Sequence, residues 1–328
     1  MILDMIFEGS NCFSMEFLYL LENLRNPVLN VLMQFVTTFG EELLFMGIAM
    51  LFLWCVDKRR GYYLLTVGFL GTQINQVLKV LFRVPRPWVK DPTFSIVESA
   101  RAEATGYSFP SGHTQVAVGT FGGIARTVSV KWIRYASIAL CVLVPFSRMY
   151  LGVHTLLDTS VSVLIALALV FGLDWLFQKV YDHPDRMRMV MVGMLAWSLA
   201  QLLFMELFPF PHTADVTLIF SAKKNAYKML GAVLGFNLVY ELDQRFLHYE
   251  IDGSWLNRTL RFVLGLACTL GVKELADLLF GLLPGGYGSL TGKALSYLVL
   301  AVFAGAVWPL TFPYFKKLDQ KLEKFIKR

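Results

Sequence analysis

Two residues able to form an oriented nucleophile lie near the middle of the chain, within residues 147–158, which read SRMYLGVHTLLD. His154 and Asp158 are four residues apart, so a helix would place them on one face, where the carboxylate can hold one imidazole nitrogen and leave the other basic. This geometry suits a histidine nucleophile, and Arg148 adds a cation. A structural hydrogen bond between the pair is the alternative, although ionisable groups within membrane segments favour a functional role.

A second candidate segment, residues 109–113, reads FPSGH and opens a predicted helix. The first N–H groups of a helix have no internal partner and the helix dipole favours negative charge, so this end suits a phosphate. Gly112 lets a ligand approach the backbone, and the Ser111 hydroxyl can bond an oxyanion. His113 stands one residue on, where it could protonate a leaving oxygen. An ordinary N-cap explains Ser111 but not the histidine.

Two further cations precede that segment. Lys79 is predicted near a helix end, and Arg86 stands before Pro87 in a turn that proline stiffens. Both side chains can converge on one anion. Taken alone, they could equally reach lipid headgroups along a membrane interface.

Together these segments resemble the type 2 phosphatidic acid phosphatase family, whose pattern is K-x6-R-P, then P-S-G-H, then S-R-x5-H-x3-D. Every position is present in the family's order and spacing, over roughly residues 26–178. The resemblance implies that His154 is the nucleophile, Asp158 its orienting residue and His113 the general acid. It implies that five residues bind the phosphate, namely Lys79, Arg86, Ser111, Gly112 and Arg148.

The implied reaction needs neither a metal nor a cofactor. His154 attacks phosphorus, the cations offset charge on the phosphate oxygens, and His113 protonates the departing oxygen. Water, with His113 now acting as the base, then hydrolyses the phosphohistidine. The sequence contains no HExxH segment or clustered carboxylates that would indicate a metal site.

The composition indicates which elements position these residues. Hydrophobic residues make up 56% of the 328 residues and charged ones 16%, whereas soluble domains are about 45–50% apolar. We therefore expect an all-α polytopic membrane helix bundle, with a six-helix phosphatase core and about four extra transmembrane helices. The expected spans are 26–39, 41–56, 61–82, 111–129, 133–150, 154–178, 189–208, 225–241, 261–283 and 292–315. Residues 15–24 are amphipathic and are expected at the interface or as an extension of the first span.

The basic residues predict the orientation. Lys and Arg gather in alternate loops, at 58–60, 126–134, 179–188 and 245–261, and in the C-terminal tail, so these parts and the termini are expected to be cytoplasmic. The candidate site then opens on the non-cytoplasmic side. The basic residues lie at span ends and not along one face, which argues against nucleic acid as the partner of this chain of net charge +6.

The polar segment 182–188, which contains Pro184, marks a predicted boundary. Residues 1–180 are expected to form the phosphatase-like membrane core, and 188–328 a C-terminal transmembrane unit whose role the sequence does not assign. That unit could cap the lipid site, mediate a homo-oligomer through its helices or bind another lipid.

The sequence favours hydrolysis of a phosphomonoester or diphosphate on a membrane lipid. A lipid phosphotransferase is an alternative, because an alcohol can resolve a phosphohistidine as water does. A lipid or anion transporter could use the same cations, with charged residues of the C-terminal spans in the moving part. A binding site, however, needs neither an oriented His154 nor a second histidine. A vanadium haloperoxidase shares this type of anion site but fits the hydropathy poorly. The headgroup remains open among polyprenyl diphosphate, phosphatidate, phosphatidylglycerophosphate and sphingoid phosphate.

Overall fold

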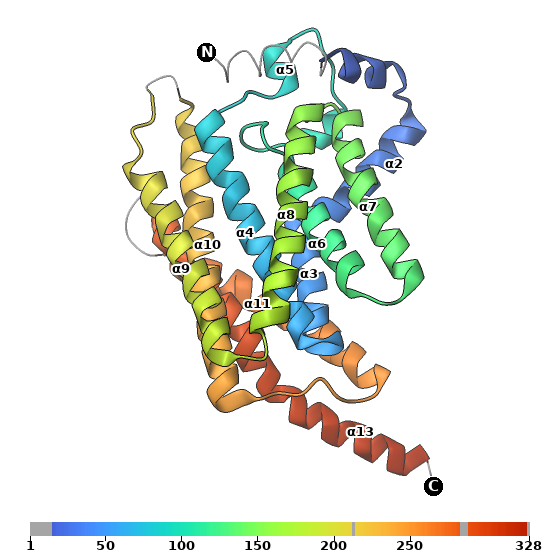
Figure 1. Ribbon diagram of the computed structural model, residues 1–328, viewed down its shortest axis with the longest axis vertical. Helices are drawn as coiled ribbons and strands as arrows, with labels where there is room; N and C mark the ends of the chain where they lie inside the picture. The colour runs from blue at the N-terminus through green and yellow to red at the C-terminus, as the bar shows by residue number, and fades with distance from the viewer. Residues whose placement is uncertain (1–14, 212–213, 283–287, 327–328) are drawn as a thin grey trace. The chain divides into compact units, whose positions relative to one another are not determined.

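The computed structural model describes residues 15–211, 214–282 and 288–326, and every regular element within these ranges is a helix (Figure 1). Four helical stretches are long and apolar enough to cross a membrane, and a bent pair would add a fifth. The four are Lys58–Lys90, Leu156–Val180, Pro184–Leu207 and Leu290–Gln320, and the pair, bent by 53°, is Pro27–Gly40 with Glu42–Val56. The expected all-helical, multi-pass membrane fold is therefore confirmed.

Each of the ten expected spans is helical over most of its described length, but α6, α7, α10 and α11 are not among the helices that are long and apolar enough to cross a membrane. Helix α6 (Gly112–Thr127) has only 16 residues. Charged side chains interrupt the apolar sequence of α7 (Lys131–Tyr150), α10 (Val216–Leu242) and α11 (Trp255–Gly281). Helices with such interruptions need neighbouring helices or interfacial water around their charges.

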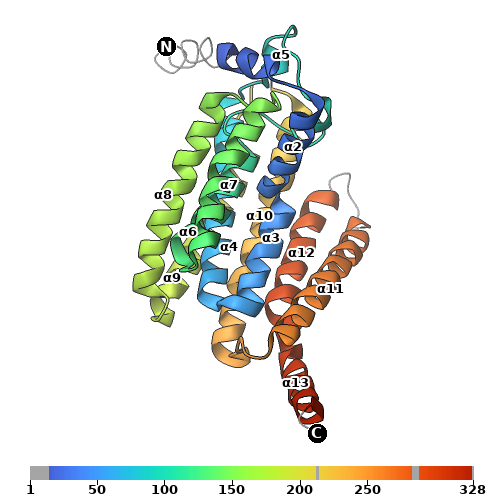
Figure 2. The ribbon, with the colours of Figure 1, turned by 90° about the vertical axis from the view of Figure 1, so that its right-hand side faces the viewer.

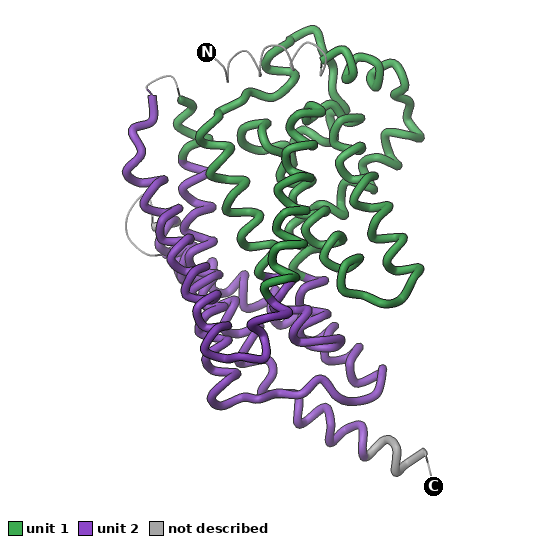
Figure 3. Tube along the Cα trace, viewed as in Figure 1, with its two compact units in different colours: residues 1–46, 66–176, 212–219 green, residues 47–65, 177–211, 220–328 purple. Residues whose placement is uncertain are grey.

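The chain divides into two compact units, neither of which is continuous in sequence (Figure 3). Unit 1 contains residues 1–46, 66–176 and 212–219, and unit 2 contains 47–65, 177–211 and 220–328. The division between residues 176 and 177 falls near the boundary that was expected at residue 180. The divisions after residues 46, 65 and 219 were not expected, and they fall within α3 (Glu42–Leu51), α4 (Lys58–Phe82) and α10, so each of these helices has residues in both units.

Unit 1 holds a bundle in which α6 packs on α7, while α2 (Pro27–Thr37) packs on α7 and η1 (Thr38–Gly40) on α6. Helices α6, α7 and α8 (Leu156–Val180) run side by side in two perpendicular views (Figures 1 and 2). A long connection with α5 (Pro87–Lys90) and η3 (Glu98–Ala100) joins α4 to α6 at one end of these helices. This end carries the candidate site.

Residues 15–23 form a helix that packs on that connection. The buried Leu18 and Leu21 contact a cluster that includes Phe94, Ile96 and Met149. The Tyr19 hydroxyl donates to Asp91 Oδ2 across 2.7 Å. The amphipathic segment expected at 15–24 is thus helical and covers part of the connection before α6.

Unit 2 contains the helices of the C-terminal part and the short segment 47–65. Trp54 Nε1 donates to the Ala304 carbonyl, and Lys58 Nζ donates to both oxygens of the buried Asp243 across 2.9 Å. These bonds explain why 47–65 belongs here. The further elements are α9 (Pro184–Leu207), η4 (Asp243–Leu247), α12 (Gly288–Val302), η5 (Phe303–Val307), η6 (Trp308–Thr311) and α13 (Phe312–Ile326).

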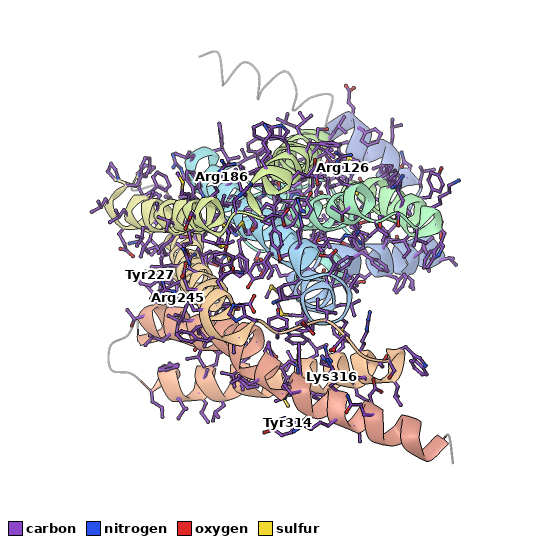
Figure 4. The ribbon with its side chains drawn as sticks, turned by 60° about the horizontal axis from the view of Figure 1, so that its bottom comes forward. Arg126, Arg186, Tyr227, Arg245, Tyr314 and Lys316 are labelled. Carbon is purple, nitrogen blue, oxygen red and sulfur yellow. The ribbon has the colours of Figure 1, made fainter. Side chains whose placement is uncertain are left out.

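Helix α13 is amphipathic, and Figure 4 shows Tyr314 and Lys316 on opposite sides of it. Lys316 forms an ion pair with Asp252, whereas the Tyr314 side chain is exposed. The expected span 292–315 therefore ends in a helix that is polar on one side, since the apolar sequence stops near Phe315.

Candidate active site

The eight residues singled out in the sequence lie at one end of unit 1. Lys79 is in the last turn of α4, Arg86 immediately precedes α5, and Arg148 is in the last turn of α7. Ser111 caps α6, and Gly112 and His113 are its first two residues. Helix ends are where backbone groups lack internal partners, so polar side chains gather there at low cost.

His154 and Arg86 are in direct contact. Arg86 Nη1 lies 3.0 Å from Nε2 of His154, and both side chains are buried. A guanidinium has only donors, so Nε2 must accept and the neutral ring carries its proton on Nδ1. This tautomer leaves the lone pair on Nε2, the nitrogen that a nucleophilic histidine would use at this position.

The relation between His154 and Asp158 differs from the expectation. His154 precedes α8 instead of lying within it, and Nδ1 is 3.6 Å from Asp158 Oδ2, beyond hydrogen-bond distance. Oδ2 instead accepts from the Ser108 hydroxyl at 2.6 Å and from the Thr155 N–H at 2.7 Å. The carboxylate therefore faces the Nδ1–H across a short gap and does not accept the direct hydrogen bond that helical spacing predicted.

A capping box explains this difference. The Thr155 hydroxyl accepts from the Asp158 N–H at 3.3 Å, while the Asp158 carboxylate accepts from the Thr155 N–H. This reciprocal arrangement starts α8 at Leu156. Asp158 therefore belongs to the helix start, and these backbone bonds fix its position beside the imidazole.

Arg148 has N–H donors that remain available for a ligand. It is fully buried, and Nη1 donates to the Thr37 hydroxyl at 2.8 Å. Within the described part of the chain, its Nε and Nη2 atoms have no hydrogen-bond partner. Buried guanidinium N–H groups without partners are costly, and a phosphate oxygen would satisfy them.

Lys79 and Arg86 hold the backbone that precedes α6. Lys79 Nζ donates to the Tyr107 carbonyl. Arg86 donates from Nε to Gly106 O at 3.1 Å and from Nη2 to Thr105 O at 2.7 Å. Its Nη1 also donates to the carbonyl of Val153, the residue before His154, at 2.8 Å. These cations therefore organise the site, in addition to supplying positive charge.

The start of α6 presents Ser111, Gly112 and His113 as expected. Ser111 Oγ accepts from the Thr114 N–H at 3.4 Å, so the hydroxyl caps the helix. A Cβ built on Gly112 would meet nothing within 4 Å, which leaves open space beside the first turn. His113 Nε2 is buried without a hydrogen-bond partner among the described residues and lies 3.7 Å from Glu103 Oε2.

Two glycines allow the close packing of these parts. A Cβ on Gly40 would lie 2.7 Å from the His113 carbonyl oxygen, so only glycine lets η1 approach α6 there. Gly152 has φ +82° and lies against Phe94 and Ile96. This left-handed turn directs the chain from α7 to His154.

Several participating residues were not assigned by sequence reasoning. Thr37 and Ser108 lie outside the recognised segments, and no spacing marks them. Thr155 with Asp158 has the T-x-x-D spacing of a capping box, which was a usable signal. Glu103, in the connection before α6, was given no role from the sequence.

The fold and the site define a multi-pass membrane protein with buried cations beside two histidines. The sequence matches the PAP2 superfamily over residues 60–182, and the transmembrane extension of PAP2 superfamily phosphatases over residues 227–321. The second match covers most of the region that the sequence left without a role. No solved structure gives a significant match.

Curated relatives agree with these matches. An undecaprenyl-diphosphatase of Sulfolobus acidocaldarius is 30% identical over 155 residues, 47% of this chain and 73% of the relative. Sphingosine-1-phosphate phosphatase 2 of Homo sapiens is 28% identical over 224 residues, 65% of this chain and 53% of the relative. Undecaprenyl-diphosphatase BcrC of Bacillus subtilis is 27% identical over 151 residues, 45% of this chain and 74% of the relative. The chain therefore belongs to the PAP2 superfamily.

Proposed function

We propose that the protein hydrolyses a phosphomonoester or diphosphate of a membrane lipid through a phosphohistidine on Nε2 of His154, without a metal. One observation carries the proposal, namely the 3.0 Å contact in which Arg86 donates to that nitrogen. It fixes the tautomer with a lone pair on Nε2 and places a cation where charge develops on the phosphate.

In the first step, Nε2 of His154 attacks phosphorus and the bond from phosphorus to the leaving oxygen breaks. The N–H groups of Arg148 and the N-terminal end of α6 receive the phosphate oxygens. Protonated His113 gives its proton to the leaving oxygen. The Asp158 carboxylate, 3.6 Å from Nδ1, balances the positive charge that the phosphorylated ring acquires.

In the second step, water attacks phosphorus and the bond to Nε2 breaks. His113, now neutral, takes the proton of the attacking water, so both histidines return to their starting states. The products are inorganic phosphate and the lipid alcohol, or the lipid monophosphate when the substrate is a diphosphate.

The phosphohistidine can be trapped with a ³²P-labelled lipid phosphate and an alkaline denaturing quench. We expect label on the wild-type chain that is lost in acid, and none on His154→Asn. His183→Asn is a matched control because that exposed histidine lies before α9, outside the site residues. Equal labelling of His154→Asn would exclude His154 as the nucleophile.

Metal independence rests on the positive charges of Lys79, Arg86 and Arg148, which take the place that Mg²⁺ has at other phosphoryl-transfer sites. Turnover should survive EDTA, and orthovanadate, which adopts the five-coordinate geometry of the transition state, should inhibit. Loss of activity in EDTA with recovery in Mg²⁺ would contradict this part of the proposal.

The names of the relatives support a lipid substrate, either a polyprenyl diphosphate or a sphingoid phosphate. A substrate that enters from the bilayer keeps its chains in hydrocarbon, so discrimination should depend on its headgroup. Lipid phosphates in mixed micelles should be cleaved much faster than glycerol 3-phosphate at equal concentration. Equal turnover of the soluble ester would remove the lipid assignment.

We further propose that the site opens on the non-cytoplasmic side, with residues 58–60 and the C-terminal tail in the cytoplasm. Labelling of single cysteines in intact cells by an impermeant reagent should reach position 152 and not position 59. The opposite pattern would invert this orientation. Association through the helices of residues 188–328 also remains a proposal, which the mass of the detergent-solubilised protein tests.

A further inference from the structure

One acidic side chain faces the proposed site and has no role in the reaction described above. Glu103 lies in the connection between η3 and α6, and its Oε2 atom is 3.7 Å from His113 Nε2 and 3.9 Å from Arg148 Nη1. Oε2 is buried and has no hydrogen-bond partner within the described part of the chain. A carboxylate therefore stands between the proposed general acid and the cation with the most unpaired donors.

The backbone on both sides of Glu103 is fixed. Ala100 and Ala104 are buried in a cluster with Tyr150, Leu151 and other apolar side chains. The Ala104 N–H donates to the Arg101 carbonyl at 3.1 Å, and the following carbonyl, that of Thr105, accepts from Arg86. The carboxylate is thus held at the site by packing and by one of the site's own cations.

The position of Glu103 identifies the part of the substrate that it faces. His113 must approach the leaving oxygen to protonate it, so a group 3.7 Å from His113 Nε2 is close to whatever that oxygen carries. In a phosphomonoester the leaving oxygen carries a carbon, and the departing group is a neutral alcohol. In a diphosphate it carries a second, anionic phosphate.

We propose that Glu103 is a specificity residue that favours lipid phosphomonoesters over lipid diphosphates, by placing negative charge at the leaving-group side. The inference rests on the proposed function. Like charges brought together at a partly buried site repel strongly, so the carboxylate should weaken binding of the diphosphate more than binding of the monophosphate. Specificity is the difference between the binding free energies of the two substrates.

The test compares a prenyl monophosphate with the diphosphate of the same chain, in identical mixed micelles. We expect a higher kcat/KM for the monophosphate in the wild type. Glu103→Gln, which removes the charge and keeps the shape, should shift the ratio of the two kcat/KM values toward the diphosphate by about tenfold or more. Glu103→Asp, which keeps the charge, should shift it less.

Glu98→Gln is the matched control. Glu98 carries the same charge in the same connection, but its side chain is exposed and paired with Arg101 at 2.7 Å. Its substitution should leave the ratio unchanged. The ratio of the two kcat/KM values distinguishes a specificity role from a structural role, because structural damage to the site would lower kcat/KM for both substrates.

The outcomes are distinct. An unchanged ratio in Glu103→Gln, or a wild type that prefers the diphosphate, would overturn the role of Glu103 while leaving lipid phosphate hydrolysis intact. Cleavage of neither lipid by the wild type would instead overturn the proposed function, and this inference with it.

Discussion

Arg86 donates from Nη1 to Nε2 of His154 across 3.0 Å, so a permanent cation touches the nitrogen proposed to attack phosphorus. The contact has two opposing effects. It fixes the reactive tautomer and orients the ring, but it also occupies the lone pair. Attack on phosphorus therefore requires the guanidinium to pass from the imidazole to a phosphate oxygen, a short movement between adjacent acceptors.

The first prediction concerns the planar shape of Arg86. Arg86→Lys keeps the charge, but one ammonium cannot reach His154 together with the carbonyls of Thr105, Gly106 and Val153. We expect turnover to fall about 100-fold, since small displacements of reacting groups cost that much. Arg83→Lys is the control, because Arg83 donates to the Val80 carbonyl at its own helix end. Near-normal turnover of Arg86→Lys would show that charge alone suffices.

The second prediction separates the two tasks of Asp158. Asp158→Asn keeps an oxygen that accepts from Ser108 and Thr155, so thermal stability in detergent should change little. Turnover should fall about 100-fold. The loss should be less than the roughly 10⁴-fold cost at a directly bonded triad aspartate, because 3.6 Å separates Oδ2 from Nδ1.

Thr155→Val provides the opposite case. It removes the hydroxyl that accepts from the Asp158 N–H and should cost about 1 kcal/mol of stability, a typical value for a lost N-cap. Its charge distribution is unchanged, so turnover at low temperature should stay near that of the wild type. Equal loss of stability in both variants would contradict this division of roles.

The third prediction concerns Thr37, which the sequence did not mark. Thr37→Val leaves Arg148 Nη1 without its 2.8 Å partner, and both side chains are fully buried. An unpaired buried donor costs about 1–3 kcal/mol, so the Arg148 guanidinium should leave its wild-type orientation. Inhibition by orthovanadate should then weaken about tenfold. Thr38→Val is the control, since that hydroxyl donates to the carbonyl of Phe35, three residues earlier, and not to Arg148. Equal inhibition of the two variants would count against a positioning role.

The fourth prediction concerns Gly40. Gly40→Ala would place a methyl group 2.7 Å from the His113 carbonyl oxygen and 2.9 Å from its Cβ, so α6 must shift at its first turn. We expect kcat to fall more than KM rises, because the proposed acid moves while the cations remain. Gly47→Ala is the control, since its Cβ meets nothing within 4 Å and alanine favours a helix. A normal kcat in Gly40→Ala would show that His113 tolerates the shift.

Spacing within single segments predicted much of the arrangement. Lys79, Ser111, His113 and Arg148 lie at the helix ends where apolar runs stop, because such runs and their polar breakers are local in sequence. The all-helical membrane fold followed from composition for the same reason.

The remaining features depend on contacts between distant segments. The bond from Arg148 to Thr37 joins residues 111 positions apart, and the bond from Ser108 to Asp158 joins residues 50 apart. Single-sequence periodicity contains no information about such pairs. The i, i+4 spacing of His154 and Asp158 was misleading, because helix α8 begins only after the histidine and its capping box uses the aspartate.

The bonds of Arg86 also bear on how the product leaves. A guanidinium has five N–H groups, and four of them are engaged by three carbonyls and His154. Except for the fifth group, each bond that Arg86 gives to inorganic phosphate must replace an existing bond, so the net attraction is the difference between two similar energies. If Arg86 binds phosphate as proposed, this exchange should shorten the residence time of the product. The enzyme should then be less inhibited by accumulated phosphate than it would be if all three cations had no other partners.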